Sequence, residues 1–416
     1  MILPERHNMK VIITPSQLKG TVAARASKSQ AHRLLICAAL SGEPCTIYCD
    51  SLSEDILATV DCLNALGADI KYDSGKFTVR PITAPLSDTV LNCRESGSTL
   101  RFMIGVVAAL GSNSTFKMSG RLPERPLSPL KEELEANGIV FSNPTADTIK
   151  LCGKLTGGKF TLDGGVSSQF ISGLLFALPL LEKESSLKIT GDIQSADYIK
   201  MTVSAIEKFG ISFEQTDNVY KIASGSYRAA KEYFVEGDWS NGAFWICANL
   251  LSANAISVTN LDSDSLQGDK EIAEIVNRFK SENLSEIIID ASNIPDLVPI
   301  ICVTASSLDG CVTVIKNAWR LRIKESDRIK ETAHLINSLG GKAQETDDGL
   351  IITGVGRLSG GKLDSAGDHR IAMSGAIASL ICDGPVEITG ADAVNKSYPD
   401  FWKDFESLGG KITIEY

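Results

Sequence analysis

Three segments in the first half of the chain place hydroxyl and basic side chains where an apolar helix should begin. In the first of them, Ser27, Lys28 and Ser29 come just before the apolar run LLICAAL, and Arg33 follows one helical turn later. The free N–H groups and the dipole of a helix N-terminus attract anions, so this arrangement could hold a phosphate or a carboxylate. It is not a Walker A loop, because the sequence G-x-x-x-x-G-K-[ST] is absent. A serine that only caps the helix, with solvated basic neighbours, would leave the same pattern.

The other two segments repeat this design. They are RESGSTLR at 94–101 and GGVSSQ at 164–169, and both lead from a hydroxyl-rich turn into an apolar run. Gly97 in the first of them would let a ligand approach the backbone closely. Each segment alone would be a helix cap more often than a binding site. The recurrence of one design in three places favours anion binding.

Charged side chains at further positions could complete such a site. Arg121 and Arg125 flank a predicted helix start, KESDR at 324–328 precedes one apolar helix, and DHR at 368–370 precedes another. The planar guanidinium of arginine suits carboxylates and phosphates. The charges at 324–328 could equally be ion pairs on a solvated helix face. Asp296 lies between EIIIDAS and LVPIICVTA, where a carboxylate is either a helix cap or a poised base.

The composition limits what such a site could serve. The chain has 416 residues, with 41 Lys and Arg against 51 Asp and Glu, and therefore a formal net charge of −10. Proteins that bind nucleic acid or a membrane surface need an extended basic face, which an acidic chain does not favour. If the substrate is anionic, positive charge must be concentrated locally.

The cysteines and the N-terminus indicate the compartment. The ten cysteines include no C-x-x-C pair and only four histidines could join them, so neither a zinc site nor a disulfide framework is predicted. Most of them lie in apolar runs, where reduced thiols act as small core residues. The N-terminal MILPERHNMK has no signal-peptide core, and the stretch Phe170 to Leu181 is shorter than the ~20 residues of a membrane helix. We therefore expect a cytoplasmic protein.

The elements that must position these residues form a repeat. Helices often end on a residue in the left-handed conformation, usually Gly, and aligning candidate helices on that stop superimposes six segments. Ile56, Val60 and Leu63 before Gly67 are one example of the shared apolar stripe. The six stops, at intervals of 71, 72, 73, 57 and 69 positions, are Gly67, Gly138, Gly210, Asn283, Gly340 and Gly409.

Strand-like runs follow most of these helices, which makes the repeat an α/β unit. A single hydrophobic core stops growing near ~250–300 residues, so six such units fit two lobes of three. Chance alignment is the alternative, since any α/β protein has helices that end in glycine.

Taken in order, the motifs resemble those of the EPSP synthase family, the 3-phosphoshikimate 1-carboxyvinyltransferases, over essentially the whole chain. Glu95, Ser98 and Ala26 depart from the usual Asn, Thr and Gly of the family, which bears on phosphoenolpyruvate contacts and inhibitor sensitivity. The matching motifs are S-K-S-x-x-x-R at 27–33, N-A-G-T-x-x-R at 95–101, E-R-P at 124–126, S-S-Q at 167–169, I-P-D at 294–296, K-E-(S/T)-D-R at 324–328, D-H-R at 368–370 and K-(S/T)-(F/Y)-P-(D/E) at 396–400.

The resemblance implies a fold and a division of the chain. The fold is α/β, the two-lobed enolpyruvyl transferase fold of six repeated helix-plus-strand units, an inside-out α/β barrel type. One lobe would comprise 1–19 and 235–416, the other 20–234, with the active site in the cleft between them. Because the basic motifs divide between 28–125 and 324–396, we expect substrate to draw the lobes together.

The implied reaction transfers the enolpyruvyl group of phosphoenolpyruvate to the 5-hydroxyl of shikimate 3-phosphate through a tetrahedral intermediate, in aromatic amino acid biosynthesis. No cofactor or metal is expected. The implied partners are the two substrates and the inhibitor glyphosate, and the chain is expected to be a monomer that binds neither nucleic acid nor a membrane. The alternatives are a UDP-N-acetylglucosamine enolpyruvyl transferase and a non-catalytic anion-binding protein on the same scaffold, which would be expected to lose Asp296 or Glu325.

The resemblance also implies the site residues. Asp296 would be the base for the 5-hydroxyl, Glu325 the acid for the methylene carbon, and Lys28 would assist proton transfer and stabilise charge. Residues implied to hold shikimate 3-phosphate are Lys28, Ser29, Arg33, Ser167, Ser168, Gln169, Ser195, Tyr198, Asp296 and Lys324. Residues implied to hold phosphoenolpyruvate are Lys28, Gly97, Ser98, Arg101, Arg125, Gln169, Arg328, His369, Arg370 and Lys396.

Overall fold

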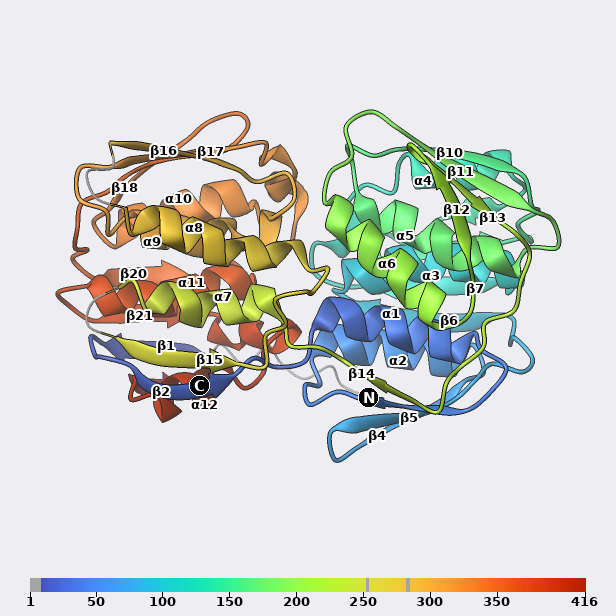
Figure 1. Cartoon of the computed structure of the whole chain (residues 1–416), viewed down its shortest axis with the longest axis horizontal. Helices are drawn as coiled ribbons and strands as arrows, with labels where there is room; N and C mark the ends of the chain where they lie inside the picture. Colours follow the sequence, from blue (N-terminus) through green and yellow to red (C-terminus); the bar gives the residue numbers. More distant parts are fainter. Residues whose placement is uncertain (1–8, 252–253, 282–284) are drawn as a thin grey trace. The chain divides into compact units, whose positions relative to one another are not determined.

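The computed structural model describes residues 9–251, 254–281 and 285–416, and it divides the chain into two compact units. Unit 1 comprises the chain up to Arg25 together with Gly237–Tyr416, and unit 2 comprises Ala26–Glu236. Each unit has its own hydrophobic core. Within each unit the sheets lie on the outside and the helices fill the interior (Figure 1).

A pattern of strand, helix, strand, helix and hairpin recurs through both units. The first two strands of a copy pair in parallel, and the hairpin then adds two antiparallel strands, so the strand order is first, second, fourth, third. One complete copy in unit 2 consists of β6 (Thr89–Arg94), α3 (Gly97–Leu110), β7 (Ser114–Met118), α4 (Leu130–Ala136), β8 (Val140–Ser142) and β9 (Thr148–Cys152).

Unit 2 contains two further copies. One consists of β10 (Lys159–Asp163), α5 (Ser168–Ala177), β11 (Ser185–Thr190), α6 (Ala196–Lys208), β12 (Phe213–Thr216) and β13 (Val219–Ile222). The other consists of β14 (Glu232–Phe234), α1 (Lys28–Ala39), β3 (Cys45–Tyr48), α2 (Glu54–Ala65), β4 (Asp69–Asp73) and β5 (Lys76–Arg80), and its first strand, β14, comes from the end of the unit.

Unit 1 contains two complete copies and a short one. The complete copies are β16 (Glu286–Asp290), α9 (Val298–Ala305), β17 (Val312–Lys316), α10 (Arg328–Ser338), β18 (Lys342–Glu345) and β19 (Leu350–Thr353), and β20 (Gly361–Asp364), α11 (His369–Ala378), β21 (Val386–Thr389), α12 (Phe401–Ser407), β22 (Lys411–Glu415) and β1 (Lys10–Thr14). The short copy consists of β2 (Lys19–Ala23), α7 (Trp239–Ala248), β15 (Ala255–Thr259) and α8 (Ile272–Phe279).

The short copy explains the one irregular interval in the sequence repeat. Its sheet has only the parallel pair β2 and β15, and in the described part of the chain α8 is followed by β16 of the next copy without a hairpin. The interval of 57 positions runs across this junction, so the shortening reflects the missing hairpin.

The helix stops confirm the predicted repeat where they can be observed. Five of them are glycines with φ between 81° and 110°, values at which a Cβ would be strained: Gly67, Gly138, Gly210, Gly340 and Gly409. Asn283, the sixth predicted stop, lies outside the described residues. The stripe residues Ile56, Val60 and Leu63 are buried on α2, as an amphipathic helix requires.

The chain crosses between the units at positions later than the expected boundaries of 19/20 and 234/235. Strand β2 pairs with β15 of unit 1, and the N–H of Ala24 donates to the carbonyl of Thr259, so the chain stays in unit 1 as far as Arg25. At the crossing the N–H of Ser27 donates to Glu236, and the N–H of Asp238 donates to Arg25, both at 2.7 Å. The two crossing segments therefore lie side by side.

The cysteines and the helix lengths complete the description of the fold. All ten cysteines are free, and every one except Cys152 is buried. Within the described ranges, no helix is both long enough and apolar enough to cross a membrane.

Candidate active site

Three of the sequence motifs of unit 2 lie at the first turns of α1, α3 and α5, helices that are almost wholly buried. Helices α3 and α5 pack closely because Gly105 and Gly173 each face the backbone of the other helix. A Cβ on Gly105 would overlap the carbonyl of Gly173, and one on Gly173 would overlap the carbonyl of Arg101. This close packing holds the two first turns together.

The serines of these motifs divide into caps and residues inside the helix. Ser27, Ser96 and Ser167 precede α1, α3 and α5, and each side chain accepts a backbone N–H of the first turn. The alternative of a serine cap is therefore correct for these three residues. A capping hydroxyl still has its proton to donate, so the cap at Ser167 is compatible with a role in binding an anion.

Gln169 joins the first turn of α5 to that of α3. Its Nε2 donates to Ser98 Oγ at 2.8 Å, and its Oε1 accepts from Arg101 Nη1 at 2.9 Å. An ideal Cβ on Gly97 would lie 2.6 Å from Arg101 Nη1 and 2.7 Å from Arg125 Nη1. Gly97 thus leaves the space that two guanidinium groups occupy, and the structure brings these predicted residues together.

Arg33 is buried between α1 and α6, with 3% of its surface exposed. Its guanidinium donates to Ser29 O at 2.6 Å, to Tyr198 O at 2.9 Å and to Thr202 Oγ1 at 2.8 Å. It also lies 5.2 Å from the ring centroid of Phe102. Burial lowers the pKa of Arg33 to about 10, so the side chain remains a cation at neutral pH.

Two further predicted residues border this region. Ser195 precedes α6 and is buried in the left-handed conformation, with φ of 55°. Such a backbone is uncommon for a residue with a Cβ and is concentrated at functional sites. Lys28 Nζ donates to Asp55 Oδ2 at 2.8 Å, an ion pair that the sequence did not indicate.

The centre of the unit 1 site is Arg328, which is 1% exposed and contacts three carboxylates. It donates to Asp296 Oδ1, Glu325 Oε2 and Asp368 Oδ2, each at 2.7 Å. Burial disfavours the charge, but the three carboxylates raise the pKa of Arg328 above its ordinary value. The alternative of a solvated ion-pair face is wrong for this residue.

Asp368 and Ser240 accept the hydrogen bonds that fix the residues around Arg328. Asp368 caps α11 by accepting the N–H of Arg370 at 2.9 Å, and its Oδ2 accepts from Ser326 Oγ at 3.0 Å. The guanidinium of Arg370 donates to Ser240 O at 2.9 Å and to Ser240 Oγ at 2.7 Å. Its Nη2 also lies 3.5 Å from Asp296 Oδ2.

Three ionisable groups of the unit 1 site have lowered pKa values, for different physical reasons. Burial disfavours the ionised form of Asp296, but Arg370, Arg328 and Lys324 hold its pKa well below the ordinary range. Burial lowers the pKa of Lys324 to about 8. Burial also lowers the pKa of Arg320, which donates to Ser292 O, to about 10. Of these groups, Lys324 has the pKa nearest to neutral pH.

Two predicted residues lie beside this network. His369 begins α11, with Nδ1 3.8 Å from Asp368 Oδ1. Lys396 ends the 3-10 helix Ala391–Lys396, and its Nζ donates to Gly367 O at 2.7 Å. The structure therefore brings the predicted residues together as two sets, one in each unit.

Sequence reasoning missed several residues in these sets. Asp55 and Arg320 reach them only through tertiary packing, and nothing in their neighbourhoods marks them. Asp238 and Ser240 had a signal, because Asp238 caps an apolar helix in the same way as Ser27, Ser96 and Ser167. The DWSN segment at the start of α7 is thus a further copy of the motif design.

Comparisons with known proteins agree over nearly the whole chain. Residues 12–405 match the family model described as EPSP synthase (3-phosphoshikimate 1-carboxyvinyltransferase). The 3-phosphoshikimate 1-carboxyvinyltransferase of Clostridium perfringens is 43% identical, with 98% of this chain and 100% of that protein covered. The corresponding protein of Clostridium acetobutylicum is 41% identical, with 97% and 98% covered.

A solved structure agrees on the fold. The EPSP synthase of Acinetobacter baumannii matches with a TM-score of 0.82 at 24% identity, covering 98% of this chain and 100% of that one. Together with the family match and the relatives, this shows that the chain belongs to the EPSP synthase family, the 3-phosphoshikimate 1-carboxyvinyltransferases.

Proposed function

We propose that this enzyme uses its two residue sets together to transfer the enolpyruvyl group of phosphoenolpyruvate to the 5-hydroxyl of shikimate 3-phosphate, releasing phosphate. The observation that carries the proposal is the network around Arg328, where three carboxylates and Lys324 adjoin a buried cation. Acid and base groups side by side are what an addition followed by an elimination requires. The membership of the family supplies the substrates.

The unit 2 set would bind the anionic groups of the substrates. Ser29, Arg33 and Tyr198 converge, and Ser168 and Ser195 lie at the starts of the neighbouring helices α5 and α6. Free N–H groups at helix starts and a buried guanidinium both favour a phosphate or a carboxylate. We assign shikimate 3-phosphate to these residues, with Ser167 and Gln169, and phosphoenolpyruvate to Gly97, Ser98, Arg101 and Arg125.

The unit 1 set would handle the protons. Asp296 is ionised at neutral pH, which is the form that a base must have, although its low pKa means that it would hold a gained proton weakly. Glu325 would be the acid, yet its Oε2 accepts from Arg328 and must first gain a proton. Lys324, with a pKa of about 8, is placed beside both carboxylates and could exchange one.

The remaining members of the unit 1 set would complete the binding of phosphoenolpyruvate. These are Arg328, His369, Arg370 and Lys396. Lys28 would serve both substrates, after the incoming anions compete with Asp55 for its ammonium. We also propose glyphosate as an inhibitor, a monomeric state and a cytoplasmic location.

A phosphate-release assay tests the proposal. With phosphoenolpyruvate and shikimate 3-phosphate the enzyme should release phosphate, and with phosphoenolpyruvate and UDP-N-acetylglucosamine it should not. If phosphate is released only in the mixture of phosphoenolpyruvate and UDP-N-acetylglucosamine, the enzyme is the rival transferase. Binding of both anions without release in either mixture would identify a non-catalytic binding protein.

A further inference from the structure

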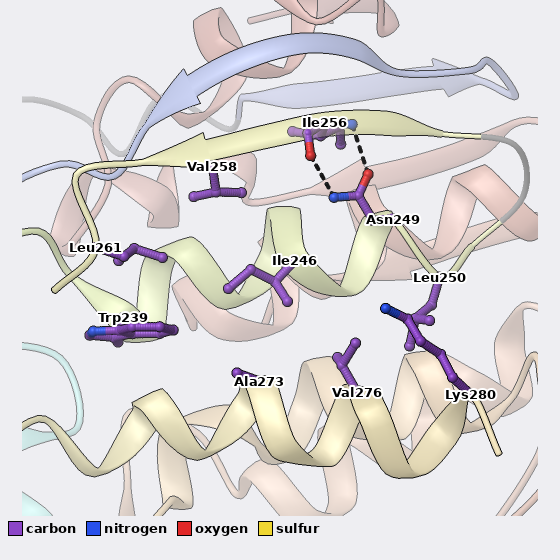
Figure 2. A pocket seen from close by; sticks show the side chains of 10 residues that line it. All are labelled: Trp239, Ile246, Asn249, Leu250, Ile256, Val258, Leu261, Ala273, Val276 and Lys280. Carbon is purple, nitrogen blue, oxygen red and sulfur yellow. Dashed lines mark hydrogen bonds between the residues drawn. The ribbon is translucent and has the colours of Figure 1, made fainter. Parts of the chain in front are cut away.

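An apolar groove lies in the short copy of unit 1, away from the residues assigned above. Its volume is about 380 Å³, and it is bounded by α7, β15 and α8 (Figure 2). Apolar side chains from these elements, and from the residues just after α7 and β15, line it: Trp239, Ile246, Leu250, Ile256, Val258, Leu261, Ala273 and Val276. The volume falls in the range of roughly 300–1,000 Å³ that is typical of small-molecule sites.

The groove lies in the one copy that differs from the other five. In the complete copies the second strand pairs with a hairpin strand, as β7 pairs with β9 and β17 with β19. On β15 the side chain of Asn249 takes that place: its Oδ1 accepts the N–H of Ile256 at 2.7 Å, and its Nδ2 donates to Ile256 O at 2.6 Å. The amide satisfies the N–H and C=O of one edge residue, Ile256, and the apolar surface beside it is open.

The polar groups that line the groove indicate which charge a ligand should carry. The amide of Asn249 is occupied by Ile256, and Trp239 Nε1 donates to Asp262 O at 2.8 Å. Lys280 is the only charged residue among the described residues that line the groove. An anionic group is therefore the polar feature of a ligand that this lining complements.

The distance between the two ends of the groove sets the length of the ligand. Ala273 and Lys280 are seven residues apart, which is about 10 Å at the rise of an α-helix. Figure 2 shows Trp239 at the Ala273 end of the groove and Lys280 at the other end. We propose that the groove binds a small amphipathic carboxylate, with its apolar body against Trp239 and its carboxylate at Lys280.

The first turn of α7 links this groove to the unit 1 site. Trp239 lines the groove, and the next residue, Ser240, accepts both hydrogen bonds from the guanidinium of Arg370. A ligand that shifts Trp239 also shifts the group that holds Arg370. The ligand is therefore an effector of phosphoenolpyruvate binding, an inference that rests on the role proposed for Arg370.

Calorimetry on the full chain tests the binding site with three probes of one shape: 4-phenylbutyrate, 4-phenylbutanol and 4-phenylbutylamine. We expect one saturable site per chain, with the carboxylate bound at least about tenfold more tightly than the amine. Lys280→Gln should weaken the carboxylate about fivefold and leave the alcohol unchanged. Lys270→Gln, which removes an exposed lysine outside the groove, is the matched control and should change neither.

Ala273→Phe fills the groove from an exposed position on α8 and should abolish binding of all three probes. Equal affinity for the three probes, or no saturation up to about 10 mM, would overturn the proposal. A dimer that Ala273→Phe dissociates, seen by sedimentation, would also overturn it, because a second chain would then occupy the groove.

Kinetics test the link to Arg370. Saturating 4-phenylbutyrate should raise the KM for phosphoenolpyruvate about fivefold with kcat nearly unchanged, and Lys280→Gln should raise about fivefold the probe concentration that gives half of this effect. Binding with no change in KM would overturn the link while supporting the site. Absence of any turnover without the probe would contradict the proposed function instead, so the two failures are distinguishable.

Discussion

Arg33 in unit 2 and Arg328 in unit 1 are both buried arginines at the centre of a candidate site, but their surroundings are opposite. Every hydrogen bond described for Arg33 goes to a neutral oxygen, and burial lowers its pKa to about 10. Arg328 contacts three carboxylates, which raise its pKa. A site with uncompensated positive charge attracts anions, whereas a balanced network redistributes protons. The difference suggests that unit 2 chiefly binds and unit 1 chiefly carries out chemistry.

The largest effect should come from removing the central cation of unit 1. Arg328→Met leaves the fully buried Asp368 without its arginine partner and removes one of the cations near Asp296 and Glu325, so we expect a loss of stability of ~3–5 kcal/mol at neutral pH. All four tryptophans, Trp239, Trp245, Trp319 and Trp402, lie in unit 1, so denaturation followed by tryptophan fluorescence measures this unit.

Arg357→Met is the matched control, because it removes an exposed arginine of the same unit that pairs with Asp383. Its effect should stay below ~1 kcal/mol. Arg33→Met sharpens the contrast, since it strands no described carboxylate and should cost unit 2 less, as measured by hydrogen exchange in α1 because unit 2 has no tryptophan. Equal losses for Arg33 and Arg328 would remove the distinction between the units.

Glu325→Gln should lower turnover at least ~10²-fold, since the amide keeps the size of the side chain but cannot donate the proton as an acid. Affinity for shikimate 3-phosphate, measured by calorimetry, should be nearly unchanged. Glu331→Gln on α10 provides the comparison and should affect neither quantity. If affinity and turnover fall together, Glu325 is structural and the assignment of chemistry to unit 1 fails.

The stability of unit 2 should depend on pH through the buried residue His32. Burial holds the pKa of His32 in unit 2 well below 6.5, so the unfolded chain takes up a proton that the folded chain does not. This contribution to stability is complete above the unfolded pKa and falls as the pH drops below it. Between pH 7 and pH 5 the loss should be about 2 kcal/mol for this one group.

His32→Gln should reduce the pH dependence by that amount, measured by hydrogen exchange in α1 and α3. His334→Gln, at an exposed position on α10, should leave it unchanged. An identical pH dependence in both variants would show that His32 does not remain neutral in the folded chain.

The smallest effect should come from Gly97→Ala, which refines the anion-binding role of unit 2. Overpacking usually costs ~1–3 kcal/mol, and because the added methyl group meets the ends of two flexible side chains, Arg101 and Arg125, we expect the lower end, about 1 kcal/mol. The KM for phosphoenolpyruvate and the inhibition constant of glyphosate should both rise, with glyphosate affected more. Unchanged inhibition would mean that this turn does not border the ligand.

The fold could be predicted from the sequence where local rules apply. The stripe before Gly67 and the positive φ of that glycine follow from helix periodicity and backbone sterics. The crossing points could not be placed in this way, because the pairing of β2 with β15 joins residues over two hundred positions apart, and no local pattern encodes it.

The motifs of the candidate site could be predicted from the sequence, but the side chains that contact them could not. Ser27, Ser167 and Asp368 stand at helix starts, which leaves a local signal. The contact of Lys28 with Asp55 and that of Arg370 with Ser240 depend on which helices pack together. The strong lowering of the pKa of Asp296 likewise arises from cations that meet only in the folded unit.

The path of the chain through the two units determines when each unit can fold during synthesis. Strands β1 and β2 are synthesised first, yet β1 pairs with β21 and β22 near the end of the chain, in a register that joins Lys10 to Glu415. Unit 2 is continuous and can fold as soon as Glu236 has emerged, whereas unit 1 must await the last residues. During that delay β1 lacks its partner strands, whereas β2 lacks its partner only until β15 has been synthesised, so β1 is the strand whose edges stay unpaired longest.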